Sequence, residues 1–143
     1  ANELKKAEIV LLGVSRTFKT PLSIYLAFKE WFVGNVPIVI GNELPPIVYK
    51  LAPSKVFCLD TNARALAELR RTRQHYLGGA VEDYDDIESI RVELMYARKT
   101  FSKNPKWAVI NVTNKPIEEI ASEILAIKGK KVKKNKNLTL PNN

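Results

Sequence analysis

The feature that most constrains this fold is the stretch GVSRTFKT at residues 13–20. The run before it, residues 7–12, is mostly apolar and is typical of a parallel strand buried on both faces. After it, Pro21 suits the first turn of a helix, and Leu22 and Leu26 continue with helical spacing. A strand, a tight turn and a helix in this order predict an α/β unit.

The rest of the chain repeats this alternation. Short apolar runs predict further strands at residues 35–40, 55–59 and 107–112. Helical spacing predicts helices at about residues 21–32, 63–75 and 83–101, one turn at 47–51, and a last helix from Pro116. Right-handed crossovers then give a three-layer α/β/α fold, with a mainly parallel sheet of about four strands and ligands at their carboxyl ends.

Length and composition indicate one globular domain. The chain has 143 residues, of which 45% are hydrophobic and 27% charged. The net charge is +8, but residues 128–143 hold six lysines and no acid, which leaves 17 basic and 15 acidic residues in residues 1–127. We therefore expect a globular domain at 1–127 and a flexible basic tail at 128–143, rather than a nucleic-acid-binding protein.

Cysteine content and hydropathy bear on the compartment. Cys58 is the single cysteine, so no internal disulfide can form, and no secretory apolar segment is apparent. No apolar run approaches the roughly 20 residues that span a bilayer. We expect a cytoplasmic protein without a membrane role.

Residues 13–20 match the Walker A pattern except at one position. The motif predicts a P-loop NTPase-like fold and makes residues 1–127 a predicted nucleotide- or phosphate-binding domain. The candidate phosphate-binding residues are Gly13, Val14, Ser15, Arg16, Thr17, Phe18, Lys19 and Thr20. A tight loop at a helix N-terminus supplies converging N–H donors, Lys19 adds a mobile positive charge, and Thr20 offers a hydroxyl to Mg²⁺. Phe18 replaces the second glycine, so the loop must keep this position in a region open to bulky residues or be distorted. The alternative is an ordinary turn in which Ser15 and Thr17 satisfy local N–H groups.

Other charged residues are weaker candidates. Arg70 and Arg73 lie three apart on one helical face and could clamp a phosphate, or they could belong to a solvated basic face. Arg16 could offset charge that develops on a transferred group. Asp60, at the end of a predicted strand, could hold magnesium or accept a proton, although helix capping explains it as well. His75 is better explained by the dipole at a helix end than by catalysis.

Several segments together resemble the pyruvate, phosphate dikinase and phosphoenolpyruvate synthase regulatory proteins. The GVSRT and KTPLS segments around the loop are a signature of that family. Further matching segments, in the family's order, are NVPIV at 35–39, ELPP at 43–46, KVF at 55–57, Leu69 and Arg70 with Arg73, IR at 90–91 with EL at 93–94 and YA at 96–97, and VT at 112–113 with IEE at 117–119. The resemblance covers about residues 7–127. The chain departs from the family's usual residues at Phe18, Asn111 and Pro116.

The resemblance implies a bifunctional regulator. Such proteins use ADP to phosphorylate a threonine of the dikinase or synthase, and they remove that group with inorganic phosphate, releasing pyrophosphate. By resemblance, the loop at residues 13–20 binds ADP with Mg²⁺, and Lys19, Arg16 and Asp60 are the catalytic candidates. The family's members are about twice as long, so the chain would correspond to their C-terminal half.

Three functional hypotheses follow. The first is the nucleotide-binding half of the kinase and pyrophosphorylase. The second is a phosphate-binding or partner-docking module whose turnover is impaired by Phe18. A small-molecule P-loop kinase is disfavoured because no second acceptor motif or lid is apparent. The oligomeric state, a homodimer included, stays open.

Overall fold

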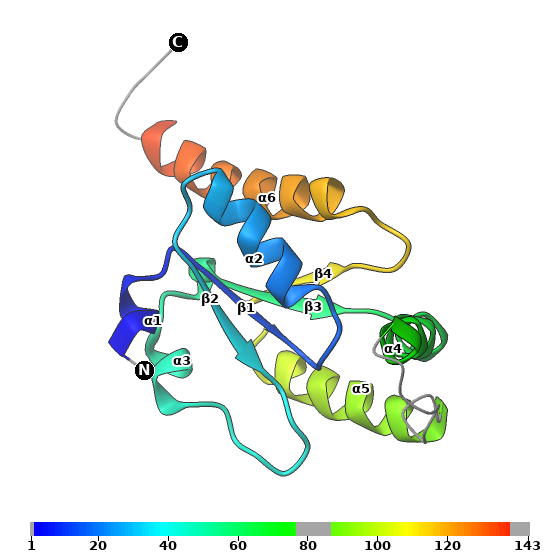
Figure 1. The fold of residues 1–143 in the computed structure, drawn as a ribbon. Coiled ribbons are helices and arrows are strands. Elements are labelled where there is room, and N and C mark those ends of the chain that lie inside the picture. Colours follow the sequence, from blue (N-terminus) through cyan, green and yellow to red (C-terminus); the bar gives the residue numbers. More distant parts are fainter. Residues whose placement is uncertain (1, 77–86, 138–143) are drawn as a thin grey trace.

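The computed structural model describes residues 2–76 and 87–137, and for residues 2, 72–76 and 130–137 it describes the backbone alone (Figure 1). The strands are β1 (Ile9–Gly13), β2 (Val33–Pro37), β3 (Val56–Asp60) and β4 (Ala108–Asn111). The helices are α1 (Asn2–Lys6), α2 (Lys19–Phe28), α3 (Pro46–Lys50), α4 (Ala63–Tyr76), α5 (Ile87–Ser102) and α6 (Ile117–Asn137), with a 3₁₀ turn η1 (Pro53–Lys55).

The four strands form one parallel sheet in the order β2-β1-β3-β4. Leu12 of β1 is in register with Val36 of β2 on one side and with Cys58 of β3 on the other. From β1 the chain passes through α2, on one face of the sheet, to the neighbouring strand β2. From β3 it passes through α4 and α5, on the opposite face, to β4, so the two connections diverge between β1 and β3. Ligands of open α/β sheets bind at such a switch point, beyond the carboxyl ends of the strands. The predicted parallel α/β fold is confirmed.

Helices cover both faces of the sheet, as Figure 1 shows. One face packs against α2 and α6, through Leu22, Leu26, Ile120 and Ile124. The other face packs against α3, α4 and α5, through Val48, Leu66, Ile90, Leu94, Ala97 and Phe101. The two central strands, β1 and β3, contribute alternate side chains to the two cores, so Leu11 and Leu12 face opposite layers. Because both faces are covered, the strands are apolar almost throughout.

The predicted boundary between the first helix and the second strand was wrong. Helix α2 ends at Phe28, not near Phe32, and β2 begins at Val33. The N–H of Glu30 bonds to Ala27 O at 2.8 Å, and the N–H of Trp31 bonds to Leu26 O at 3.1 Å. This is the Schellman arrangement, with Glu30 in the left-handed position (φ 70°) that glycine usually occupies. Because Glu30 is not a glycine, no helix stop signal is recognisable in the sequence before Gly34.

The strand predicted at residues 35–40 would place Pro37 near its start, whereas Pro37 is the last residue of β2. The next residue, Ile38, donates its N–H to Gly13 O at 3.0 Å. Successive backbone N–H groups of a strand point in opposite directions, so the nitrogen of Pro37 faces the free side of the sheet. Since β2 is an edge strand, no ladder hydrogen bond is lost there.

Two predicted segments fall partly outside the described residues. The helix predicted from residue 83 is described only from Ile87 onward. Helix α6 runs to Asn137, past the boundary predicted at residue 127, so the division into residues 1–127 and 128–143 stays a prediction. Among the described residues, no helix is both long enough and apolar enough to cross a bilayer.

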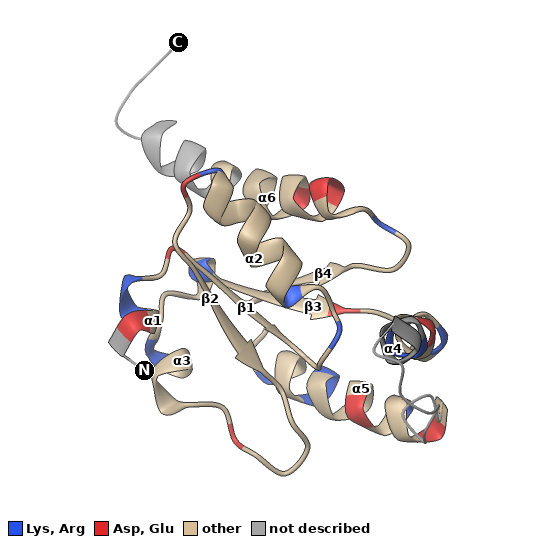
Figure 2. Cartoon of the chain, viewed as in Figure 1, with Lys and Arg blue, Asp and Glu red and all other residues tan. Residues whose placement is uncertain are grey.

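Charged residues lie on the helices and loops, while the strands are nearly free of them (Figure 2). Within the four described strands, Asp60 is the one charged residue, and it lies at the carboxyl end of β3. The carboxyl edge of the sheet is therefore where charge and the predicted ligand site coincide.

Candidate phosphate-binding site

The predicted phosphate loop leaves β1 at Gly13 and enters α2 at Lys19. Inside it, the hydroxyl of Thr17 donates to Val14 O at 2.7 Å, and Thr17 is fully buried. Arg16 and Phe18 both have left-handed backbones, with φ of 67° and 72°. The loop thus turns tightly at the start of a helix that has no side-chain cap. Uncapped N–H groups and the positive end of the helix dipole favour an anion at this position.

Gly13 is required by a close approach. A Cβ atom at this position would lie 2.6 Å from Thr17 Oγ1 and 3.3 Å from the backbone oxygen of Leu59. Neither distance is compatible with an undisturbed loop. The first glycine of the motif therefore allows the loop to fold back against β3.

Phe18 adopts the conformation that the missing glycine would supply. Its φ and ψ are 72° and 16°, in the left-handed region, at the N-cap of α2. For an L-residue this backbone costs about 1–2 kcal/mol. The ring is partly buried against the core between the sheet, α2 and α6. The loop therefore keeps its turn with a phenylalanine in this position, at a conformational cost.

Lys19 folds back over the loop. Its Nζ donates to Gly13 O and to Val14 O, each at 2.9 Å. Burial, and then the positive charges of Arg16 and Arg70, lowers the pKa of Lys19 from 10.5 to about 8. The ammonium is held by neutral carbonyls alone, so an incoming anion would gain a charged partner already positioned above the loop.

The loop cavity has a volume of about 350 Å³ and is lined by Ser15, Arg16, Phe18, Lys19, Thr20, Pro21 and Leu69. Two of these side chains, Arg16 and Lys19, are cationic. The Nε atom of Arg16 is buried and has no hydrogen-bond partner within the described part of the chain. A buried donor without an acceptor is costly, and a phosphate oxygen in the cavity is the kind of acceptor it lacks.

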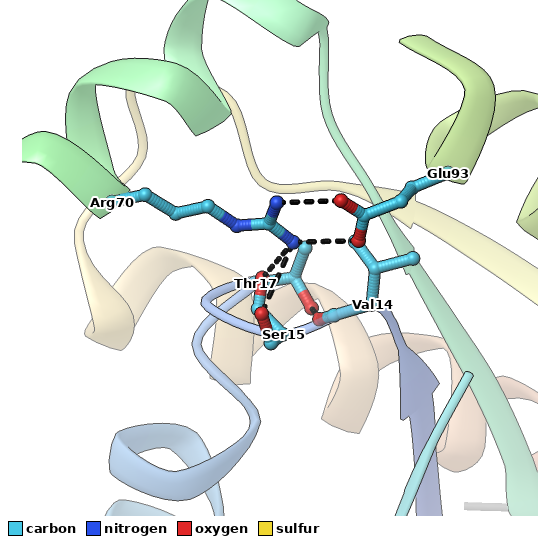
Figure 3. A network of polar contacts seen from close by, with 5 residues as sticks. All are labelled: Val14, Ser15, Thr17, Arg70 and Glu93. Atoms are coloured by element: carbon cyan, nitrogen blue, oxygen red, sulfur yellow. Dashed lines mark hydrogen bonds and ion pairs between the residues drawn. The ribbon is translucent and has the colours of Figure 1, made fainter. Parts of the chain in front are cut away.

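Arg70 of α4 reaches across to the loop and holds it in place (Figure 3). Its guanidinium forms two bonds with the carboxylate of Glu93 in α5, at 2.7 and 2.9 Å. The same group donates to the backbone oxygen of Ser15 at 3.2 Å and to its hydroxyl at 3.0 Å. Arg70 is 2% exposed. The structure brings this predicted residue to the loop, where it contacts the loop itself and ties it to α5.

Asp60 lies beside the loop's strand and is held by an arginine. Arg98 Nε lies 3.0 and 3.1 Å from its two carboxylate oxygens, and Arg98 also donates to the backbone oxygen of Thr61. Asn62 accepts the N–H of Ala65 at 2.8 Å, so the side chain that caps α4 is Asn62 and not Asp60. A role for Asp60 in magnesium binding or proton transfer stays a prediction.

Some candidates lie outside the described side chains, and others were missed. The side chains of Arg73 and His75 are among those not described. Sequence analysis did not single out Glu93 or Arg98, since each contacts a partner far away in the chain. The position of Glu93 was the best signal in the sequence for such a contact. Glu93 lies next to the apolar stripe of α5, where a charged side chain needs a partner.

Among the described residues, neither the Cys58 thiol nor a group of metal-ligating side chains adds a candidate for catalysis or metal binding. Burial, with a smaller effect of Asp60, raises the pKa of the Cys58 thiol to about 12, so it remains protonated. Within residues 2–76 and 87–137, no group of three or more His, Cys, Asp and Glu side chains is arranged to hold a metal ion. Magnesium at Thr20 would depend on phosphate oxygens for most of its ligands.

Comparison with known proteins identifies the family. The sequence profile of the Kinase/pyrophosphorylase family matches residues 1–125. The chain belongs to the kinase/pyrophosphorylase family. This kinase/pyrophosphorylase chain is 49% identical over 124 residues to the chloroplastic pyruvate, phosphate dikinase regulatory protein of Zea mays. It is 47% identical over 123 residues to a putative pyruvate, phosphate dikinase regulatory protein of Geotalea uraniireducens, and 46% identical over 127 residues to a chloroplastic relative of Arabidopsis thaliana.

The matches cover most of the kinase/pyrophosphorylase chain but only part of each relative. They span 85–87% of this chain, and 29%, 46% and 32% of the Zea, Geotalea and Arabidopsis proteins. The chain thus spans less than half the length of these three relatives. The resemblance inferred from the loop and the later segments is confirmed at the level of the family.

Proposed function

We propose that this chain is the nucleotide-binding part of a regulatory protein-threonine kinase and pyrophosphorylase that acts on pyruvate, phosphate dikinase. The observation that carries the proposal is the loop cavity, where Arg16 and Lys19 meet at the start of the uncapped helix α2. The family to which the chain belongs and the names of its relatives support the class of reaction and the target.

One cavity can serve both directions of control. In the kinase reaction, a threonine oxygen attacks the β-phosphorus of ADP, the bond to the α-phosphate oxygen breaks, and AMP leaves. In the pyrophosphorylase reaction, an oxygen of inorganic phosphate attacks the phosphothreonine, pyrophosphate forms, and threonine regains a proton. Each reaction places a diphosphate group at the loop, so both need the same cationic cavity.

In the proposed site, each charged or polar residue at the loop has a separate role. The N–H groups at the start of α2 and the Lys19 ammonium would hold the terminal phosphate, and the hydroxyl of Thr20 would reach a magnesium ion bound to the same oxygens. Arg16, with its unpartnered Nε, would neutralise charge on the transferred group. Arg70 would keep Ser15, and with it the loop, in place.

Calorimetric titration with ADP and with pyrophosphate, each with Mg²⁺, tests the proposal. We expect saturable binding of both, and Lys19→Ala should weaken each by about 1.5–3 kcal/mol, the value of a charged hydrogen bond. Lys50→Ala, an exposed lysine of α3, is the matched control and should leave both affinities unchanged. An absence of heat with ADP, phosphate and pyrophosphate alike would remove the proposal.

A phosphate-binding or docking module without turnover is the second candidate, and the left-handed Phe18 is the observation that favours it. The two candidates differ in product formation. Incubated with pyruvate, phosphate dikinase, ADP and Mg²⁺, the kinase would release AMP in step with threonine phosphorylation. The docking module would bind ADP but release no AMP.

A further inference from the structure

A second cavity adjoins the loop cavity at the carboxyl edge of the sheet. This adjoining cavity has a volume of about 380 Å³ and is lined by Phe18, Thr61, Ala65, Glu68, Leu69, Val112, Thr113, Asn114, Lys115 and Pro116. It lies between the start of α4 and the segment that joins β4 to α6. Phe18 and Leu69 line both cavities. Together, the two hollows extend from β1 across β3 to β4.

The adjoining cavity differs in charge from the loop cavity. Its charged residues are Glu68 and Lys115, of opposite sign, and Lys115 is paired with Glu123 at 2.8 Å. The loop cavity, in contrast, holds the two cations Arg16 and Lys19. A diphosphate would therefore favour the loop cavity, and a neutral group attached to it would be the part that reaches the adjoining one.

The walls of the adjoining cavity suit a flat, largely apolar group. Phe18, Leu69 and Val112 provide an aromatic face and two aliphatic side chains. At one wall, the hydroxyls of Thr61 and Thr113 are hydrogen-bonded to each other at 2.7 Å. That bond uses one of their two hydrogens, so the pair keeps one donor for a ligand. Apolar walls with a few placed polar groups are the usual composition of small-molecule and cofactor sites, and they would suit a nucleoside.

The segment after β4 is held in place by its own hydrogen bonds. Val112 N donates to Asp60 O at 2.8 Å, and Asn111 Oδ1 accepts the N–H of Thr113 at 2.8 Å. Asn114 has a left-handed backbone, with φ of 56°. A segment fixed in this way can receive a ligand without first being ordered, which lowers the cost of binding.

We infer that the adjoining cavity holds the ribose and base of a nucleoside diphosphate whose phosphates occupy the loop cavity. The inference rests on the proposed function and adds where the nucleoside lies. Stacking on the Phe18 ring, burial against Leu69 and Val112, and a hydrogen bond from the Thr61–Thr113 pair would retain it. Pyrophosphate, which has no nucleoside, would leave this cavity empty.

Titration of two variants with two ligands tests the inference. Ala65→Leu should narrow the adjoining cavity and weaken ADP binding about tenfold, and Thr113→Val should weaken it about threefold. Both should leave pyrophosphate affinity within about twofold of the native chain. Ala27→Leu, which adds the same side chain at an exposed position of α2, controls for the substitution itself. Thermal unfolding of each variant establishes that it is folded.

The outcomes separate this inference from the proposed function. Selective loss of ADP binding in both variants supports it. Equal loss of ADP and pyrophosphate binding, or no loss of either, overturns it while the phosphate site stands, provided that Lys19→Ala still weakens both ligands. Unchanged ADP affinity with slowed threonine phosphorylation would assign the cavity to the protein substrate instead. If the native chain binds neither ligand, the inference falls together with the proposed function.

Discussion

Two strand-to-helix turns lie side by side at the same edge of the sheet, and they are built in opposite ways. The turn from β3 to α4 has its polar groups paired, because Asn62 caps the helix and Arg98 of α5 pairs with Asp60. The turn from β1 to α2 has no side-chain cap, and it contains two left-handed residues, Arg16 and Phe18. Strained backbone persists only where its surroundings hold it in place, and it is common at ligand sites.

The difference teaches where a ligand is expected. A turn whose polar groups are already paired gains little from an anion, whereas one with uncapped N–H groups and a cation held by neutral carbonyls gains much. The strained turn also depends on support from outside itself, namely the Arg70–Glu93 pair. Changes to that support should therefore have the largest effects.

Arg70→Met should be the most disruptive single change. It leaves Glu93 without its partner and Ser15 without its two contacts, and we expect a loss of about 2–4 kcal/mol in the free energy of unfolding, below the ~3–5 kcal/mol of a fully buried pair because Glu93 is 29% exposed. Pyrophosphate affinity should fall as well. Urea unfolding and calorimetry measure both quantities.

Arg98→Met is the matched control, since it breaks the more exposed ion pair at the neighbouring turn. Its cost should be about 0–1 kcal/mol. Equal losses of stability in the two variants would mean that the Arg70–Glu93 pair gives the loop no special support.

Gly13→Ala should have the next largest effect. The added Cβ would lie 2.6 Å from Thr17 Oγ1, so either the bond from Thr17 to Val14 or the turn itself must shift. We expect a loss of about 1–3 kcal/mol in stability, the usual cost of overpacking. Gly129→Ala makes the same chemical change in α6, where the added Cβ would meet no described atom within 4 Å apart from its chain neighbours and the backbone of its own helix, and it should not destabilise the chain. Similar melting temperatures for both variants would show that the loop tolerates the methyl group.

The pH dependence of pyrophosphate binding should reveal Lys19. Because its pKa in the free chain is lowered to about 8, the ammonium is largely lost at pH 9, and binding must restore the proton. We expect the native chain to lose about tenfold more affinity than Lys19→Met between pH 7 and 9. The comparison with Lys19→Met removes the titration of pyrophosphate itself. Parallel pH profiles would contradict a charged Lys19 at the anion.

The lowered pKa of Lys19 should affect stability in the opposite direction, so that stability increases with pH where pyrophosphate affinity decreases. Between about pH 8 and 10.5 the unfolded chain binds more protons at Lys19 than the folded chain does. The folded chain should therefore gain stability with rising pH in this window, relative to Lys19→Met. Thermal unfolding across the window measures this gain.

The sequence predicted the sheet and the loop because both follow from local patterns. Buried strands appear as apolar runs, and the loop carries its own residue types between a strand and a helix. The end of α2 was missed because Glu30 takes the left-handed position without being a glycine. The signal used in prediction was the residue type, whereas the structure requires only the backbone conformation.

The supporting contacts of the site could not be read from the sequence. Arg70 and Glu93 lie 23 residues apart, and Thr61 and Thr113 lie 52 apart. Such pairs depend on which strands are neighbours, and periodicity does not give the strand order. The sequence analysis expected Arg70 to contact a phosphate, because the strand order that places it against Ser15 was not known. The structure shows that Arg70 contacts the loop itself.

Asn62→Ala should give the smallest effect and mark the limit of the comparison between the two turns. Loss of the bond from Ala65 N to Asn62 Oδ1 should cost about 1 kcal/mol of stability. Pyrophosphate affinity should stay within about twofold of the native chain, since this turn contributes no donor to the loop cavity. Asn42→Ala, at an exposed position, controls for loss of the amide. A clear drop in pyrophosphate affinity for Asn62→Ala, without a drop for Asn42→Ala, would mean that the two turns act as one unit. The turn from β3 to α4 would then influence the conformation of the turn from β1 to α2.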